Sequence, residues 1–492
     1  MTETAKKKRG MPSSFTILLA LLAIVAVVTV FVSGTSGGAV TAARLSDFCT
    51  APIKGFADAL PVCLFVMILG GFLGMMTETG ALDNGIAVLV QKLKGNEIML
   101  IPVLMLIFSL GGTTYGMCEE TVPFYALLAA TMMAAGFDPM VGAATVLLGA
   151  GCGCLGSTVN PFAVGAAVDA LTGVGIEVNQ SIIIGLGAVL WIVTTAMSIV
   201  FVMNYAKKVK ADKGSTILSM QELKDAEEAH GKAASEVHKE VKLTGRQKGV
   251  LIAFAFTFVV MIVGFIPLAD LNEGVANFFD AGAVYDADGN AVVQGWSALI
   301  TGLPIGQWYF DEASTWFFLM AVLIGIIGGL SEKQIVNTFI TGAADMMSVV
   351  LVIALARGIS VLMANTGLDV YVLDAAANAL AGLSGVIFAP MSFLVYFGLS
   401  FLIPSTSGMA TVSMPIMGPL AVKLGFSPEV MVMIFSAAIG VVNLFTPTSG
   451  AIMGGLALAK IEWTTWLKFA LKLIVALSVV CAVILTVACV LL

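Results

Sequence analysis

Apolar runs long enough to cross a bilayer recur along this chain of 492 residues, separated by shorter polar stretches. A membrane-spanning helix needs about 20 consecutive, mostly apolar residues. The clearest runs of that kind are residues 15–33, 60–77, 182–204, 249–267, 314–330 and 466–491. The pattern therefore predicts an all-α integral membrane protein whose chain crosses the bilayer several times.

One polar pattern occurs twice. Residues 112–117 read Gly-Thr-Thr-Tyr-Gly-Met, and residues 404–409 read Pro-Ser-Thr-Ser-Gly-Met. After a further apolar run, each copy leads to a polar break, Gly-Ser-Thr-Val-Asn-Pro at 156–161 and Phe-Thr-Pro-Thr-Ser-Gly at 445–450. Apolar segments that Gly, Pro, Ser and Thr interrupt at corresponding places in two halves are the best sequence indicator of a transporter's binding site.

The basic and acidic loops predict the orientation of the chain. The N-terminus (residues 1–10) and the linker 206–248 are rich in Lys and Arg, whereas the loop 268–312 contains neither. Lys and Arg mark the cytoplasmic side of a membrane. We therefore expect 1–10 and 206–248 to be cytoplasmic, 268–312 to be extracytoplasmic, and helix 249–267 to connect them.

This connecting helix inverts the second half relative to the first. The first transmembrane repeat, 11–205, makes four crossings and would return the chain to the side where it began. One additional crossing then makes the second repeat, 313–492, begin and end outside. Within the repeats we predict two re-entrant helical hairpins and two discontinuous helices, with the hairpins near 98–135 and 386–424 and the broken helices near 140–172 and 428–458.

Composition excludes several classes of protein. The chain is 59% hydrophobic and 11% charged. The core of a soluble protein does not need so large a share of apolar residues, so this composition excludes a soluble globular protein. Two histidines and seven scattered cysteines predict neither a metal cluster nor a disulfide framework. Because no nucleophile with a base is visible, we expect no enzymatic activity and no cofactor, and we expect no nucleic-acid partner.

Four motifs resemble one transporter family. Residues 116–125 read Gly-Met-Cys-Glu-Glu-Thr-Val-Pro-Phe-Tyr, and 155–162 read Leu-Gly-Ser-Thr-Val-Asn-Pro-Phe. Together with Ala-Arg-Gly at 356–358 and Ser-Gly-Met-Ala at 407–410, they resemble the C4-dicarboxylate anaerobic carrier family. More narrowly, they resemble its YfcC-type branch, which is described as basic amino-acid antiporters.

The resemblance implies an inverted-repeat fold of the ion-transporter superfamily, a homodimer whose subunits each move a transport domain like an elevator against a scaffold. It also implies that hairpin tips and helix breaks hold the substrate and the coupling cation. Carried onto this sequence, the binding residues are Thr113, Thr114, Ser157, Asn160, Ser405, Thr406, Thr448 and Ser449. The same motifs contain the hydroxyls of Thr158 and Ser407 and the structural residues Gly112, Gly116, Pro161, Gly408, Pro447 and Gly450. A metal ion, if one couples transport, is expected to be Na⁺ near the two breaks, and H⁺ is the alternative.

Charges that occur in only one half are candidates for substrate chemistry. Glu119 and Glu120 align with uncharged residues of the second half, and so does Asp169. A charge at the bilayer centre costs roughly 2.5–3.5 kcal/mol even on insertion scales, so each requires a reason. Neighbouring helical residues point about 100° apart. We therefore expect one of the two glutamates to bind the substrate's amino or guanidinium group or to carry a proton, and the other to stabilise a helix N-terminus.

Arg357 aligns with Gly70 and lies in an apolar run. Its planar fork suits a substrate carboxylate, and an internal ion pair with an acid is the alternative. Asp58 and Asp345 follow equivalent glycines in the two halves, and we expect both to be structural residues at helix ends.

The pattern as a whole predicts a secondary active transporter of the bacterial inner membrane. A basic amino acid such as arginine or ornithine is the expected substrate, carried by antiport or by cation-coupled symport. A cation-coupled C4-dicarboxylate carrier is the alternative, and a membrane enzyme or a channel is a third reading. The expected partners are a small-molecule substrate, the lipid bilayer and a second copy of the chain.

Overall fold

The computed structural model describes most of the chain. The described residues are 14–82, 84, 85, 88, 96–236, 242–266, 268–271, 273–286, 291–403 and 405–492. The predicted cytoplasmic N-terminus, residues 1–10, lies outside them.

The described chain is helical almost throughout and has one two-stranded antiparallel sheet. The first half contains α1 (Ser14–Ser33), α2 (Leu45–Asp58), α3 (Leu60–Glu78), η1 (Glu97–Met99), α5 (Leu100–Tyr115), η2 (Glu119–Thr121), α6 (Val122–Ala134), α7 (Pro139–Leu155), η3 (Pro161–Gly165), α8 (Ala166–Thr172) and α9 (Gln180–Ala211). The middle of the chain contains η4 (Lys213–Ser215), α10 (Met220–Glu236), α11 (Gly245–Phe265), α12 (Leu268–Leu271), α13 (Glu273–Phe279), β1 (Val284–Tyr285) and β2 (Ala291–Val293). The second half contains α14 (Phe310–Gly328), α15 (Glu332–Asp345), α16 (Met347–Thr366), α17 (Leu368–Leu380), α18 (Gly385–Leu402), α19 (Thr406–Lys423), α20 (Pro428–Val442), α21 (Gly450–Leu458) and α22 (Trp463–Leu491).

Eight of the described helices are long and apolar enough to cross a membrane. They expose apolar side chains that a soluble protein would bury. On α22, for example, Val475, Val479, Val483 and Val487 are each more than half exposed and recur at every fourth residue, so they form one stripe along the helix. Such a stripe suits contact with lipid. These features confirm the predicted multi-pass, all-α membrane protein.

The first arm of the predicted hairpin near 98–135 is longer than its apolar run. The apolar stretch ends near residue 110, but helix α5 continues to Tyr115, and with η1 it covers 19 residues. The Thr114 hydroxyl finds its partner within this helix, because it donates to the carbonyl of Leu110, one turn back, at 2.7 Å. The arm is thus long enough to cross a membrane, and its re-entrant course remains a prediction.

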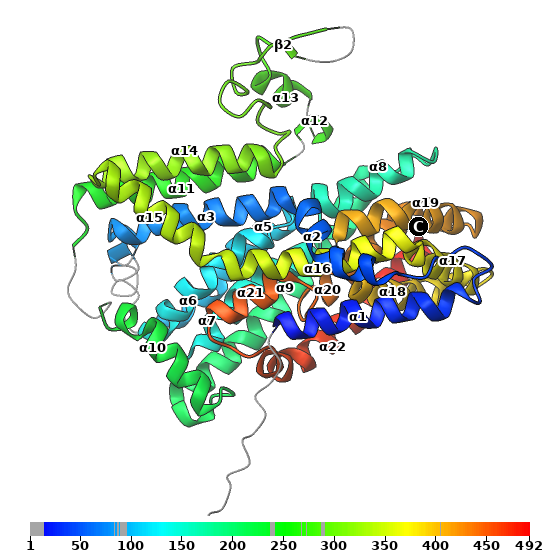
Figure 1. Ribbon diagram of the computed structural model, residues 1–492, viewed down its shortest axis with the longest axis horizontal. Coiled ribbons are helices and arrows are strands. Elements are labelled where there is room, and N and C mark those ends of the chain that lie inside the picture. The colour runs from blue at the N-terminus through cyan, green and yellow to red at the C-terminus, as the bar shows by residue number, and fades with distance from the viewer. Residues whose placement is uncertain are drawn as a thin grey trace, which may run out of the picture.

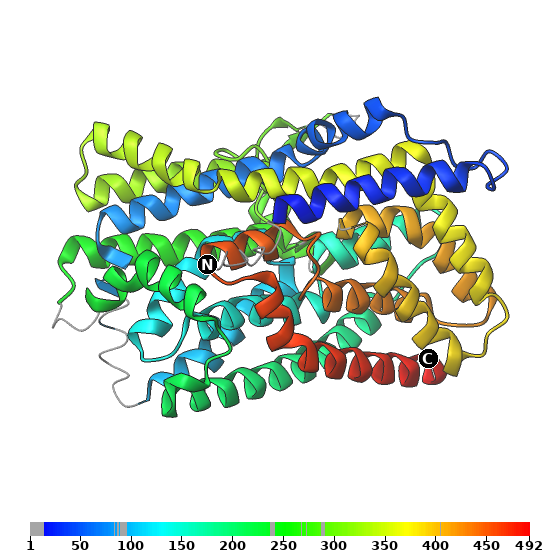
Figure 2. The ribbon, with the colours of Figure 1, turned by 60° about the horizontal axis from the view of Figure 1, so that its bottom comes forward.

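The two halves use the same elements in the same order. Each contains, in this order, one long helix, a 14-residue helix (α2 or α15), another long helix, a helix pair, a broken helix and a long final helix. Among the described elements, the second half also contains α17 between α16 and its helix pair. Contacts between the halves are also reciprocal: α2 packs on α16 as α15 packs on α3, and α6 packs on α21 as α19 packs on α8. Figure 2 shows α1, α2, α3, α14, α15 and α16 in one layer above the helix pairs and broken helices. The inverted relation of the halves remains a prediction.

Glycines let the two reciprocal crossings approach backbone to backbone. A Cβ atom on Gly55 of α2 would overlap the backbone nitrogen of Gly358 on α16, and one on Gly342 of α15 would overlap the carbonyl of Gly70 on α3. Only glycine allows helices to come this close. Both crossings therefore have the same tight geometry.

The loops between the halves differ in their contacts. The segment with α12, α13 and the β1–β2 pair extends away from the helix bundle (Figure 1). The linker helix α10 instead packs on α6. The Glu222 carboxylate is 4% exposed and accepts the backbone N–H groups of Ser219 and Glu462 at 2.8 and 3.0 Å. The ring Nε2 of His230 lies 3.1 Å from the carbonyl oxygen of Leu458. The linker is therefore fastened to the junction of α21 and α22.

Glu222→Ala removes the shared acceptor of two backbone N–H groups, a loss that costs about 1–3 kcal/mol where the groups are buried. We expect α10 to undock and trypsin to cut at Lys224 faster than in the wild-type protein. Limited proteolysis of the detergent-solubilised protein, followed by mass spectrometry, measures this rate. Glu228→Ala, at an exposed position of the same helix, is the control. Equal cleavage rates in the two variants would contradict the docking role of Glu222.

Candidate functional site

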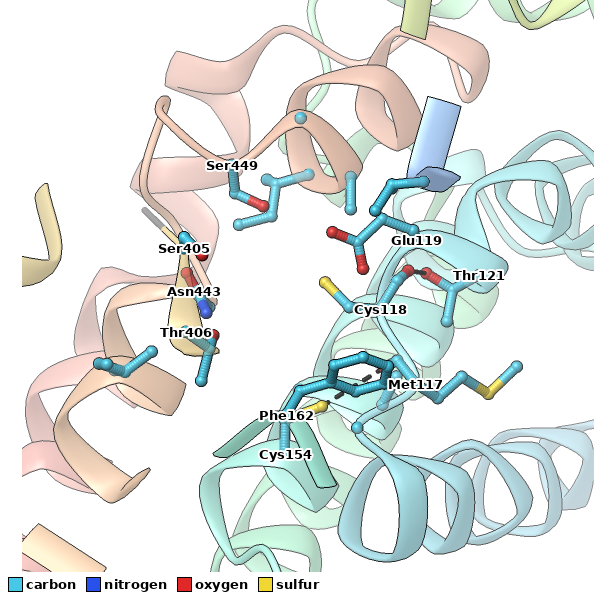
Figure 3. A pocket seen from close by; sticks show the side chains of 18 of the residues that line it. Met117, Cys118, Glu119, Thr121, Cys154, Phe162, Ser405, Thr406, Asn443 and Ser449 are labelled. Carbon is cyan, nitrogen blue, oxygen red and sulfur yellow. Dashed lines mark hydrogen bonds between the residues drawn. The ribbon is translucent and has the colours of Figure 1, made fainter. Parts of the chain in front are cut away.

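A cavity of about 170 Å³ lies where the two helix pairs and the two helix breaks meet. The segment after α5, the α7–η3 break, the start of α19 and the α20–α21 break line it, and α16 supplies Arg357. Its polar lining includes Glu119, Asn160, Ser405, Thr406, Asn443 and Ser449, several of which Figure 3 shows around the open space.

The end of α5 positions the acidic side of the cavity. Gly116 ends the helix at a φ of 81°, in the left-handed region that favours glycine. A Cβ atom on Gly116 would also overlap the Asn160 side-chain amide, at 2.5 Å from its Oδ1. The turn at Gly116 thus brings the first hairpin tip against the first helix break. Cys118, Glu119 and Glu120 follow directly.

The adjacent glutamates have different surroundings. Glu120 is 2% exposed, and its Oε2 accepts the backbone N–H of Cys118 at 3.0 Å, which closes the turn before α6. The Glu119 carboxylate points into the open space of the cavity (Figure 3). The Glu120 carboxylate thus stabilises the turn, and the Glu119 carboxylate can bind a ligand.

The threonines of the first tip and break bond to each other. The Thr113 hydroxyl is 1% exposed and donates to the carbonyl of Gly156 at 2.6 Å. In return, the backbone N–H and hydroxyl of Thr158 donate to the carbonyl of Thr113 at 2.9 and 3.0 Å. Neither threonine lines the cavity. These bonds fasten α5 to the break after α7.

Ser157 and Asn160, also predicted as binding residues in the first half, form hydrogen bonds at the helix ends. Ser157 donates to the carbonyl of Cys154 at 2.6 Å and accepts from the Asn160 amide at 2.9 Å. The Asn160 Oδ1 accepts the N–H groups of Phe162 and Ala163 and so caps the helix that resumes at Pro161. Of the predicted polar residues in this half, Asn160, Glu119 and Glu120 border the cavity, whereas Ser157 and Thr114 do not.

The second half presents hydroxyls to the cavity. Ser405, Thr406 and Ser407 line it at the start of α19, and Thr448 and Ser449 line it at the second break. The Ser405 Oγ accepts the N–H of Gly408 at 3.1 Å and caps α19. The side chains of Thr406 and Ser449 face the open space in Figure 3. This half therefore supplies groups that both donate and accept.

The predicted glycines and prolines shape the walls. A Cβ atom on Gly112 would overlap the carbonyl of Ala150, and one on Gly450 would overlap Ile353, so both glycines permit close packing. Pro161 begins η3, where no intrahelical N–H bond is needed, and Pro447 lies in the turn between α20 and α21. Gly408 is the residue that Ser405 caps.

Arg357 forms an ion pair with Asp58. Its Nε lies 2.8 Å from the Asp58 Oδ2, while the rest of the side chain borders the cavity. Of the two readings of Arg357, an internal ion pair is thus present, with an acid for which the sequence predicted only a structural role.

Sequence reasoning missed Asn443. Its amide faces the open space in Figure 3. The signal was available, because Asn443 directly follows the mostly apolar helix Pro428–Val442 and comes just before the second break. It also missed Cys118, Cys154 and Phe162, whose side chains border the cavity. Asp169 lies on α8 and is exposed, away from the cavity.

The breaks offer oxygen ligands to a cation. The hydroxyls of Thr446 and Thr448 are buried and lie 2.7 Å apart at the second break. Hard cations take oxygen ligands of this type. Among the described residues, no three or more His, Cys, Asp or Glu side chains gather as metal ligands do. A Na⁺ site near the breaks remains a prediction.

Comparison with known proteins identifies the family. The family model of C4-dicarboxylate anaerobic carriers matches residues 38–490. The chain belongs to this family. A protein of Haemophilus influenzae described only as uncharacterized is 28% identical over 445 residues, which cover 90% of this chain and 78% of that protein. An Escherichia coli protein, YfcC, named provisionally as a basic amino acid antiporter, is 27% identical over 440 residues, covering 87% and 77%.

Two solved structures are similar over nearly the whole chain. MtrF of Neisseria gonorrhoeae, described as one of a class of antimetabolite efflux pumps, has a TM-score of 0.44 at 17% identity and covers 98% of this chain and 96% of its own. The YdaH transporter of Alcanivorax borkumensis has a TM-score of 0.48 at 15% identity, with 97% and 98% covered. The family that the chain belongs to is one of membrane carriers, so the predicted family and the predicted transport role are confirmed at that level.

The two glutamates should respond differently to substitution. Glu119→Gln removes the charge that faces the cavity, and we expect transport to fall more than about tenfold, because at least ~1.4 kcal/mol of binding is lost. Its thermal stability should stay near that of the wild type. Glu120→Ala leaves the Cys118 N–H without its acceptor and should lower the melting temperature by several degrees. Uptake into proteoliposomes and thermal unfolding measure the two effects. Wild-type transport by Glu119→Gln would exclude a role in binding or coupling.

Proposed function

We propose that this chain is a secondary active transporter that carries a basic amino acid, such as arginine or ornithine, across the bacterial inner membrane. The observation that carries the proposal is that opposite charges border one cavity: Glu119, whose carboxylate points into the open space in Figure 3, and Arg357. Transport then proceeds by antiport or by cation-coupled symport.

The charges suit a zwitterion that has one further positive group. The Arg357 guanidinium can bind an α-carboxylate through two parallel hydrogen bonds. Glu119 can accept from an amino or guanidinium group, and the hydroxyls of Thr406 and Ser449 bind either kind of group. Three carboxylates, those of Asp58, Glu119 and Glu120, lie at or near the cavity against one guanidinium. This excess of acids favours a cationic solute.

The size of the cavity also favours an amino acid as the substrate. Pockets for drug-sized ligands measure about 300–1,000 Å³. At about 170 Å³, this cavity suits a much smaller solute, such as a single amino acid. The name of the Escherichia coli relative, a basic amino acid antiporter, agrees with this reading.

An elevator-type mechanism accounts for the two layers. The layer with α3 and α16 acts as the scaffold, and the helix pairs and broken helices carry the substrate past it. The reciprocal contacts of the two halves support an inverted repeat with re-entrant hairpins, which places both tips near the bilayer centre. The scaffold would pair two copies into a homodimer, with the N-terminus cytoplasmic and the C-terminus extracytoplasmic.

A C4-dicarboxylate is the second candidate, which the description of the family favours. Such a solute needs two cationic contacts, or one contact with the N-terminus of a half-helix beside it. Arg357 is the one Lys or Arg that borders the cavity among the described residues. The acids around it would repel a second carboxylate.

Counterflow in proteoliposomes separates the two candidates. With unlabelled arginine inside, we expect saturable uptake of labelled arginine and no uptake of labelled succinate. Repeating the assay with and without Na⁺, and across a pH gradient, identifies the coupling ion. Saturable exchange of succinate but not arginine would establish the dicarboxylate carrier, and exchange of neither would refute both.

Arg357→Lys keeps the positive charge but loses the planar fork. Because a lysine cannot form the two parallel hydrogen bonds, we expect the KM for arginine to rise about tenfold, equivalent to ~1.4 kcal/mol. Initial uptake rates over a range of arginine concentrations measure the change. An unchanged KM would argue against direct binding of the carboxylate by Arg357.

A further inference from the structure

We infer that Asp58 is a positioning residue for the substrate: it holds Arg357 by one edge so that the other edge of the guanidinium meets a carboxylate in the cavity. The inference rests on the proposed function, in which Arg357 binds the substrate's carboxylate. Asp58 itself does not line the cavity. Its effect on the substrate therefore passes through Arg357.

The contact between the two side chains determines which edge stays available. A guanidinium has five N–H donors in a fixed plane, and a carboxylate can bind at the edge that contains Nε or at the edge formed by the two Nη atoms. Asp58 Oδ2 contacts Nε at 2.8 Å. Among the described residues, Arg357 has no second ion-pair partner within 4.0 Å. The edge with both Nη atoms is thus available to a ligand.

The backbone fixes the ion pair. Gly358 follows Arg357 directly and is the residue that Gly55 of α2 meets at the crossing with α16. Asp58 lies three residues after Gly55, so it stands on the same face of α2, nearly one turn along. Because the two backbones touch at the crossing, the two side chains cannot drift apart by a shift of the helices.

The second half contains the same crossing without the cation. Gly342 of α15 meets Gly70 of α3, and Asp345 lies three residues after Gly342, as Asp58 does after Gly55. The position equivalent to Arg357 is Gly70 itself. Gly70 and Asp345 also border a separate cavity, of about 780 Å³. The crossing therefore forms without an arginine, and a cavity wall here does not require one.

The exposure of the pair also favours a role in binding over a role in stability. The Asp58 side chain is 52% exposed and that of Arg357 25%. Where that exposure is to water, such an ion pair adds little to folding stability. The crossing occurs in both halves, but only the one between α2 and α16 has an arginine, Arg357, paired with an acid. A ligand bound by the remaining N–H donors of Arg357 best explains why the arginine is there.

The test compares Asp58→Asn with Asp345→Asn, its counterpart at the crossing that lacks an arginine. Affinities of the purified proteins are measured for L-arginine and for L-argininamide, which has no carboxylate. We expect Asp58→Asn to weaken L-arginine binding about tenfold, equivalent to ~1.4 kcal/mol, with argininamide binding unchanged. Asp345→Asn should leave both affinities within about twofold of the wild type, less than ~0.5 kcal/mol.

A double variant tests whether the effect passes through Arg357. We expect Asp58→Asn to cause no further loss of L-arginine affinity when it is added to Arg357→Gln. Additive losses would overturn the inference, and so would an equal loss for arginine and argininamide or no loss for either. A merely structural aspartate would weaken both ligands together.

The design separates this inference from the proposed function. If the wild-type protein binds succinate and not arginine, the proposed substrate is wrong, and succinate and its monoamide replace the two ligands. A loss specific to succinate in Asp58→Asn then still supports the positioning role. If the wild-type protein binds no carboxylate of either kind, both the function and the inference fail.

Discussion

The two helix breaks depend on one constraint, which is that polar groups in the bilayer need partners within the protein. The first break meets this constraint through bonds that its own residues make: Thr113 bonds to Gly156, Thr158 bonds to Thr113, and Asn160 caps the helix that resumes. The second break meets it only in part. Thr446 and Thr448 bond to each other, while Ser449 and the neighbouring Asn443 face the cavity. A ligand is the natural partner for these remaining groups.

The two halves therefore contribute differently to one site. The first half supplies a rigid tip with a charged group, Glu119, whose neighbour Glu120 is used to close the turn. The second half supplies hydroxyls that can rotate to donate or accept. Arg357 comes from neither tip but from α16, a helix of the other layer. A solute bound between them would touch both layers. Its affinity would therefore depend on the relative position of the two layers.

The sequence predicts the helices well and the side-chain roles poorly. Helix positions follow from apolar runs, because bilayer thickness fixes their length, and Gly116 and Pro161 mark the tip and the break. Hydroxyl direction does not follow, because it depends on carbonyls far along the chain: Thr113 turns to Gly156, away from the cavity. The ion-pair partner of Arg357 could not be predicted either, because it also comes from a distant part of the chain. Only the packing of α2 on α16 brings Asp58 to it.

In the proposed function, charge balance favours a basic amino acid over the dicarboxylate that the family description suggests. Two carboxylates, those of Glu119 and Glu120, border the cavity beside one guanidinium, and the interaction of like charges strengthens as water is excluded. A dicarboxylate would add two negative charges to that excess. A basic amino acid brings a net positive charge, and its own carboxylate meets Arg357 with two donors that Asp58 leaves available. The family description names a dicarboxylate, whereas the charges that border this cavity suit a cationic solute better.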